Sequence, residues 1–225
     1  MVGKESSGRC ELCGQAFAKT EMTKHLGKCD KWTAGPTETF HLAIGQTGSP
    51  RYWLHLEAAA ATTLEDLDGF LRDVWLDCCG HMSSFTIGRT SYSSLRDVDQ
   101  EVHDKPMHMA VLGKVLKPGA AFEHEYDFGT PTKLALKVAG RRQTKLRAKE
   151  SVRLLARNDP PSYTCVDCEK APATDICSSC SWKSGGTVCE RCRNEHACGK
   201  AMLLPLVNSP RTGVCGYTGP EIQRR

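Results

Sequence analysis

Cysteines in close pairs dominate the last third of the chain. Residues 165–198 read CVDCEKAPATDICSSCSWKSGGTVCERCRNEHAC, which contains three C-x2-C pairs followed by a histidine and a further cysteine. A C-x2-C turn brings two thiolates together at the geometry that a tetrahedral zinc ion needs. A thioredoxin-like redox pair would lie within a βαβ pattern, and no such pattern surrounds these pairs. The spacing therefore predicts two zinc ions in this segment.

The order of the pairs predicts how the two ions share their ligands. If alternate pairs hold one ion, the arrangement resembles the cross-brace of RING, MYND and B-box modules. The first ion then has the ligands Cys165, Cys168, Cys189 and Cys192. The second ion has Cys177 and Cys180 with two of His196, Cys198 and Cys215. Residues 189–198 read as a helix, on which positions 196 and 198 point about 200° apart, so the last two ligands stay open.

A second pattern of cysteine and histidine lies at the N-terminus, where residues 10–29 read CELCGQAFAKTEMTKHLGKC. The spacing C-x2-C-x11-H-x3-C resembles a ββα zinc finger with a final cysteine. Phe17 and Met22 would form its small core, and its helix would carry the last two ligands one turn apart. Fingers of this type bind DNA, RNA or protein. The expected ligands, which bring the total to about three zinc ions, are Cys10, Cys13, His25 and Cys29.

The composition is that of a cytoplasmic protein with one modest core. The 225 residues are 40% hydrophobic, and the formal net charge is +4. The sequence contains no run of about 18 apolar residues, so no transmembrane helix is expected. The opening MVGKESSGRC lacks the apolar region of a signal peptide. Thiols stay reduced in the cytoplasm, so we expect metal-bound cysteines, no disulfides and no membrane partner.

Two proline-containing stretches divide the chain into three expected domains. TAGPTE (33–38) and DPPSY (159–163) separate a finger over 1–34, a central domain over 38–158 and a two-zinc module over 160–225. In the central domain, alternating patterns predict strands over 51–58, 83–88 and 151–157, and a hairpin over 121–128 and 133–140. Helices are expected over 62–79, with a capping box from Thr62 to Glu65, and over 107–119. The expected fold is α+β, with an antiparallel sheet and helices.

The central domain also resembles a known family. The stretches TLEDLDGFLRDVWLDCCGHMSSFTIG and FEHEYDFGTPTKLALKV resemble the plasmid pRiA4b ORF-three-like family, over roughly residues 50–157. The resemblance implies a compact α+β fold, and a nucleic-acid context because some members travel with plasmids or insertion elements. After YDFG this chain has TPTKL where the family pattern has Asp, Trp and His, so YDFG is interpreted as a hairpin signature. The matching positions are Leu64, Leu67, His81, Phe85, Ile87, Tyr126, Asp127, Phe128 and Gly129.

Two further clusters could do chemistry. The stretch RRQTKLRAKESVRLLAR (141–157) is strongly basic and could follow a phosphate backbone, although such a run is commonly a solvated face. Its candidate nucleic-acid contacts are Arg141, Arg142, Lys145, Arg147 and Lys149. Cys78, Cys79 and His81 lie close together, but no fourth ligand is obvious nearby, so we expect them to pack in the core as small hydrophobes.

Together these patterns predict a zinc-binding protein that acts as an interaction module for nucleic acid or for another protein. Saturated metal sites and the missing Asp and His argue against catalysis. One alternative is an enzyme that processes nucleic acid and is linked to mobile elements. The other is a structural scaffold protein.

Overall fold

The computed structural model describes residues 6–95, 104–181 and 185–220, which fall into two compact units. The first unit contains the chain up to Arg72 together with His81–Asp159. The second contains Asp73–Gly80 and the chain from Pro160 onward. Each unit has its own sheet, and the combination of sheets with a few helices confirms the predicted α+β class.

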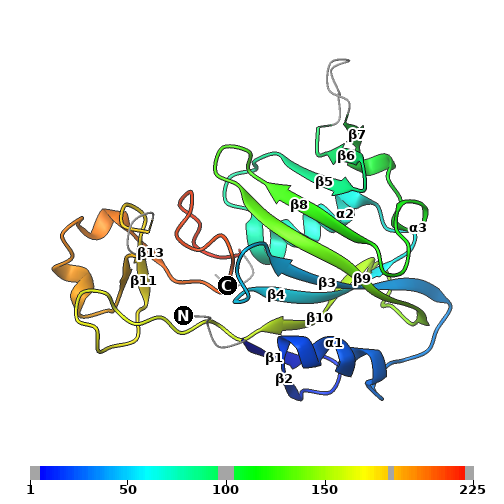
Figure 1. Cartoon of the computed structure of the whole chain (residues 1–225), viewed down its shortest axis with the longest axis horizontal. Coiled ribbons are helices and arrows are strands. Elements are labelled where there is room, and N and C mark those ends of the chain that lie inside the picture. Colours follow the sequence, from blue (N-terminus) through cyan, green and yellow to red (C-terminus); the bar gives the residue numbers. More distant parts are fainter. Residues whose placement is uncertain (1–5, 96–103, 182–184, 221–225) are drawn as a thin grey trace. The chain divides into compact units, whose positions relative to one another are not determined.

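A sheet of ten strands forms the first unit within the described residues (Figure 1). The strand order is β2-β1-β10-β4-β3-β9-β8-β5-β6-β7, and all neighbours are antiparallel except β6 and β7. The strands are β1 (Ser7–Cys10), β2 (Ala16–Ala18), β3 (Thr37–Gln46), β4 (Trp53–Ala59), β5 (Ser83–Ile87), β6 (Thr90–Ser93), β7 (Lys105–Pro106), β8 (Ala121–Tyr126), β9 (Thr132–Thr144) and β10 (Val152–Asn158). The helices are α1 (Lys19–Lys28), α2 (Leu64–Leu71) and α3 (Leu112–Val115).

The alternation of apolar and polar residues that predicted the second strand of the hairpin is present in the structure as alternating burial. In β9 the side chains of Leu134, Leu136 and Val138 are buried, whereas those of Lys133 and Lys137 are exposed. This period of two is the signature of a strand with one face toward a core. The strand β3 was not predicted, because buried polar residues such as Thr39 and His41 interrupt its apolar pattern.

Both predicted helices of the central domain are shorter than expected. α2 continues as a π-helical turn over Arg72–Leu76, which ends before the vicinal cysteines. The second predicted helix consists of a 3₁₀ turn at Met107–Met109 followed by the four residues of α3. Among the described helices, none has the length and apolarity that crossing a bilayer would require.

The capping box of α2 lies one residue later than predicted. The hydroxyl of Thr63 accepts a hydrogen bond from the Asp66 amide at 3.1 Å, and the Asp66 carboxylate accepts one from the Thr63 amide at 3.0 Å. Thr62, the predicted cap, is buried and donates to the carbonyl of Ser151. The prediction from Thr62 and Glu65 was therefore wrong in register, because two consecutive threonines offer the same motif.

A buried carboxylate joins four strands at the centre of the sheet. Glu57 of β4 is fully buried. One of its oxygens accepts hydrogen bonds from Thr39 of β3 at 2.8 Å and Thr144 of β9 at 2.7 Å. The other accepts from Nε of Arg153 in β10 at 2.6 Å. Buried polar groups need such partners, so this network fixes which residues of the four strands face one another.

Two buried histidines face each other on neighbouring strands. Nε2 of His41 and Nδ1 of His55 lie 2.9 Å apart. Burial, aided by the positive charge of Arg142, lowers the pKa of His41 to about 4. Burial, aided by His41 and Lys19, lowers the pKa of His55 to about 3. Both rings are therefore neutral at pH 7, and one N–H can bridge the pair.

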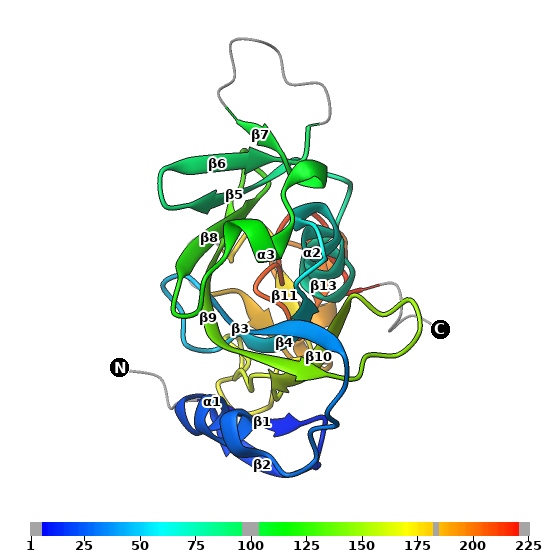
Figure 2. The same cartoon turned by 90° about the vertical axis from the view of Figure 1, so that its right-hand side faces the viewer.

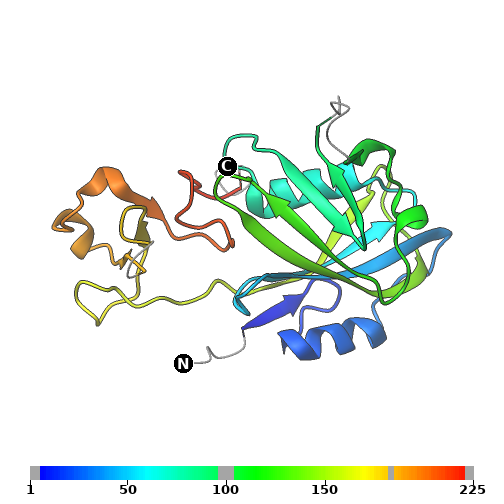
Figure 3. The same ribbon diagram turned by 45° about the horizontal axis from the view of Figure 1, so that its top comes forward.

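The N-terminal ββα segment continues the sheet of the first unit. β1 pairs with β2 on one side and with β10 on the other (Figure 2). Gly8 is required at this contact, because a Cβ atom there would lie 2.1 Å from the carbonyl oxygen of Arg157 and 2.6 Å from the ring of Trp53. α1 lies alongside the β1–β2 hairpin (Figure 3).

The second unit holds a small antiparallel sheet of order β12-β11-β13. Its strands are β11 (Asp175–Cys177), β12 (Thr187–Val188) and β13 (Leu203–Pro205). A small cluster of Cys165, Val188 and Cys189 is buried here. The helix predicted over 189–198 is reduced to a 3₁₀ turn at Cys192–Asn194. His196 and Cys198 therefore lie beyond the helical residues.

Candidate metal centres

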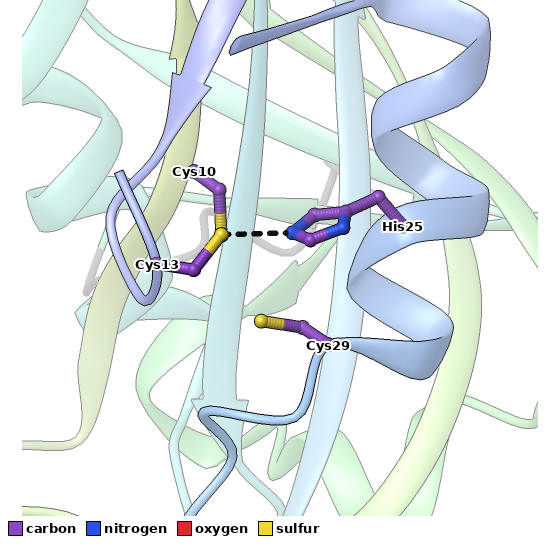
Figure 4. Close-up of side chains that lie close together, drawn as sticks. All are labelled: Cys10, Cys13, His25 and Cys29. Atoms are coloured by element: carbon purple, nitrogen blue, oxygen red, sulfur yellow. Dashed lines mark hydrogen bonds between the residues drawn. The ribbon is translucent and has the colours of Figure 1, made fainter. Parts of the chain in front are cut away.

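The first candidate centre lies in the N-terminal ββα segment. Cys10 ends β1, Cys13 lies in the following turn, His25 is on α1 and Cys29 follows that helix (Figure 4). Their sulfur and nitrogen atoms all lie within 4.8 Å of one another, and Sγ of Cys13 is 3.3 Å from Nε2 of His25. The ring of Phe17 stacks on His25 with the centroids 4.0 Å apart. All four predicted ligands are thus brought together.

The helix that carries His25 is held by apolar packing. Met22 and Leu26 of α1 are fully buried in a cluster that includes Trp53 and Leu155 of the sheet. The indole nitrogen of Trp32 donates to the carbonyl of Leu26 at 2.7 Å. The sheet therefore positions α1, and α1 positions two of the candidate ligands.

The second candidate centre is made by the first and third C-x2-C pairs. Cys165, Cys168, Cys189 and Cys192 have their sulfur atoms within 4.8 Å of one another, and the sulfurs of Cys168 and Cys189 are 3.9 Å apart. The second pair of the segment does not take part. The structure therefore has the alternating arrangement that the spacing predicted.

Backbone amides and neighbouring thiols change the acidity of the cysteines in this group. Hydrogen bonds from the amides of Ala171 and Lys170 lower the pKa of Cys168 to about 6. Hydrogen bonding to Cys189, followed by burial, raises the pKa of Cys192 to about 12. The first effect favours a thiolate, whereas the second opposes further negative charge beside it. A bound divalent cation removes this conflict, because it binds cysteines as thiolates.

The third candidate centre resolves a choice that the sequence left open. Cys177 and Cys180 lie within 4.8 Å of both His196 and Cys198. Sγ of Cys180 is 3.5 Å from Sγ of Cys198 and 3.8 Å from Nε2 of His196. The unwound chain after the 3₁₀ turn lets positions 196 and 198 turn to the same side. Nδ1 of His196 lies 2.9 Å from a carboxylate oxygen of Asp167, which raises the pKa of the imidazole and is an arrangement that orients metal-binding histidines.

A fourth group of thiols was not predicted. Cys215 lies with Cys78 and Cys79, not with the third centre. The sulfurs of Cys78 and Cys79 are 3.7 Å apart, and so are those of Cys79 and Cys215. Cys79 and Cys215 are exposed and Cys78 is half-buried, so the expectation that the CCGHM stretch packs in the core is wrong. The sequence offered three candidates for the last two ligands of the third centre, so one of them was in excess, but the distance along the chain hid that Cys215 belongs with Cys78 and Cys79.

The basic stretch is partly engaged within the first unit. Arg141 forms an ion pair with Glu38. Arg142 is half-buried, its guanidinium lies 3.9 Å from the ring centroid of Trp32, and it donates to the carbonyl of Leu26. Lys145, Arg147 and Lys149 are exposed. Three of the five candidate nucleic-acid contacts thus lie exposed at the surface.

The YDFG stretch builds a turn. Asp127 has a φ of +66°, and its carboxylate accepts hydrogen bonds from the amides of Gly129 and Thr130. This turn connects β8 to β9. An aspartate that satisfies the amides of its own turn is a common hairpin device, and it agrees with the interpretation of YDFG as a structural signature.

Comparisons with known proteins give distant structural neighbours. No protein-family model and no curated protein matches the chain. The chain is similar to the crystal structure of MM3350, a protein of unknown function from Methanosarcina mazei Go1, at 15% sequence identity. The match covers 53% of this chain and 68% of that one, with a TM-score of 0.46.

Proposed function

We propose that this chain is a zinc-stabilised binding protein of a thiol-reducing compartment, in which the metal ions are structural and the partner is another protein. The observation that carries the proposal is the pairing in the second unit, where the first and third C-x2-C pairs form one four-ligand group and the second pair joins His196 and Cys198 in another. Together with the finger, three zinc ions are bound.

The distances between ligand atoms support zinc. With Zn–S bonds of about 2.3 Å and tetrahedral angles, two sulfurs lie about 3.8 Å apart, and a sulfur and a histidine nitrogen lie about 3.6 Å apart. The observed S–S distances of 3.5 and 3.9 Å, and the S–N distances of 3.3 and 3.8 Å, lie on both sides of these values. Groups rich in thiolate are typical of zinc.

The ligand number supports a structural role for the metal. Each of these three groups supplies four protein ligands, whereas catalytic zinc keeps one position for water or substrate. The apolar cluster around Val188, beside the ligands of the second centre, is small, and cores of this size commonly need metal to fold. A structural zinc site contributes on the order of 10 kcal/mol to such a fold.

A protein partner is supported by apolar side chains beside the metal-held loops. Val166 and Met202 are 39% and 41% exposed. Val166 follows the ligand Cys165, and the carbonyl of Met202 accepts hydrogen bonds from the amide and hydroxyl of Ser178, which follows Cys177. The metal sites thereby fix the backbone that presents both side chains.

The test compares purified full-length chains with and without these two side chains. Native mass spectrometry should find at least three zinc ions, one for each of the three groups described above. A partner that is cross-linked by the wild type should be lost from the double variant Val166→Asp/Met202→Asp, and kept by Met109→Asp, a control at a side chain that is 73% exposed in the first unit. Equal recovery with both variants would remove the support for a protein partner that contacts Val166 and Met202.

Nucleic acid is the second candidate, favoured by the exposed Lys145, Arg147 and Lys149. Fluorescence anisotropy with mixed-sequence DNA and RNA should show affinity that falls steeply with salt, by about 0.9 in the logarithmic slope for each phosphate contact on duplex DNA. Replacing these three residues by Gln should reduce that slope. The matched control replaces the exposed Lys114, Lys117 and Lys137 by Gln. Absent or salt-insensitive binding would reject this candidate.

We also propose that the central domain expected over residues 38–158 is a pRiA4b ORF-three-like domain. The support is the order of its elements, with a strand, a capped helix, a strand and a hairpin in sequence, and the turn built by Asp127. An alignment of relatives in which the turn residues Tyr126–Gly129 vary freely would contradict this assignment.

A further inference from the structure

The fourth group of thiols is held in place by its own hydrogen bonds within the second unit. The hydroxyl of Ser209, which is fully buried, donates to the carbonyl of Trp75 at 2.6 Å. The same hydroxyl accepts a hydrogen bond from the amide of Arg211 at 2.8 Å. These bonds fasten residues 207–217 to Asp73–Gly80 and bring Cys215, which is far away in sequence, to the vicinal pair Cys78 and Cys79.

The backbone at Cys215 has a conformation that is unusual for a residue with a side chain. Cys215 has a φ of +49°, which lies in the left-handed region that residues with a side chain rarely adopt. Gly213 and Gly216, with φ values of +79° and +67°, flank it. Non-glycine residues in this region persist where the surroundings fix them, and they gather at functional sites.

The spacing of the three sulfurs fits a metal site and not a disulfide. Cys78 and Cys79, and Cys79 and Cys215, are separated by 3.7 Å between sulfurs. The corresponding distance around a tetrahedral zinc ion is about 3.8 Å, whereas a disulfide needs about 2.05 Å. Two of the three cysteines are exposed, so apolar packing does not explain why they gather.

A buried arginine supplies a second, independent observation. Arg211 is fully buried, and its guanidinium donates to Sγ of Cys78 at 3.5 Å. A buried guanidinium cannot lose its proton, so it needs negative charge nearby. A zinc ion with three thiolate ligands carries a net charge of −1, which Arg211 would balance.

We propose that Cys78, Cys79 and Cys215, which all belong to the second unit, bind a fourth zinc ion through their three thiolates. With this site, all thirteen cysteines of the chain belong to one of four metal centres.

The direct test is native mass spectrometry of the wild-type full-length chain, purified in a reducing buffer with zinc. Four zinc ions per chain are expected. Three ions would overturn this inference and leave the proposed function standing, whereas none or one would overturn both. A mass lower by two hydrogens, with Cys79 and Cys215 protected from alkylation, would replace the metal site by a disulfide.

Variants locate the fourth ion. The double variant Cys79→Ser/Cys215→Ser should bind one zinc ion fewer than the wild type. With cobalt in place of zinc, this double variant should lose three of the thirteen thiolate–metal bonds. Its thiolate-to-cobalt charge-transfer absorption should fall by about the same fraction. The matched double variant Cys180→Ser/Cys198→Ser should also lose one ion, and the quadruple variant two. If the first double variant keeps the wild-type metal content, the three thiols do not form a site.

Discussion

Neutralising Glu57 should cost far more stability than neutralising a surface carboxylate on the same sheet. Glu57 is fully buried, and Arg153 pairs with it while 21% of the arginine side chain stays exposed. Removing one partner of a buried pair costs about 3–5 kcal/mol. Because Arg153 keeps some contact with water, we expect Glu57→Gln to cost about 3 kcal/mol.

The matched control is Glu38→Gln, which breaks the exposed pair with Arg141 on the neighbouring strands. Surface pairs of this kind contribute about 0–1 kcal/mol. Thr144→Val, which removes one neutral donor to Glu57, should cost about 1 kcal/mol. The loss of stability is therefore expected to be largest for Glu57→Gln, smaller for Thr144→Val and smallest for Glu38→Gln.

The assay is amide hydrogen exchange in β4 and β10 at saturating zinc, which reports the free energy of opening of the sheet itself. A double-mutant cycle with Arg153→Met isolates the pair, and we expect a coupling of about 2 kcal/mol. A coupling below about 0.5 kcal/mol, or a Glu57→Gln variant as stable as Glu38→Gln, would refute the idea that this carboxylate fixes the sheet.

Three further outcomes follow from the structure. Thr63→Ala should destabilise the chain by about 1 kcal/mol because it removes the cap of α2, while Glu65→Gln should be nearly neutral; urea unfolding separates the two. The lowered pKa values of His41 and His55 mean that the unfolded chain binds protons that the folded chain does not, so stability should fall as the pH drops below about 6.5, by about 1.4 kcal/mol per pH unit for each histidine, until about pH 4 and 3. A His41→Gln variant should show a shallower dependence in acid titrations of unfolding, and an unchanged slope would contradict the assignment. His25→Ala should lose one zinc ion by elemental analysis and lose exchange protection in α1 but not in β9; a protected α1 without metal would show that packing alone holds it.

Short, regular patterns carried most of the sequence prediction. A C-x2-C pair places its ligands through one local turn, so the pairs in the second unit could be assigned before any fold was known. The hairpin of β8 and β9 was equally readable, because Leu134, Leu136 and Val138 alternate with lysines and alanine. In both cases the information lies within a few residues of the chain.

The features that were missed depend on distant contacts. Cys215 meets Cys78 and Cys79 only because Ser209 and Arg211 fold its loop onto residues 73–80, and no local spacing records that. The choice of two ligands among His196, Cys198 and Cys215 required knowing that the expected helix unwinds, which lets His196 and Cys198 join the same group. β3 was hidden because its buried polar side chains are satisfied by partners on other strands, which a search for apolar alternation cannot detect.

The pairing of β1 with β10 covers an edge of the large sheet. The β1–β2 hairpin covers the main chain of Ala156, Arg157 and Asn158, which would otherwise form an open sheet border. Uncovered borders of this kind recruit strands from other molecules and start aggregation. A metal ion bound by Cys10, Cys13, His25 and Cys29 would stabilise this hairpin, so its removal would be expected to expose the edge of β10 and to promote aggregation.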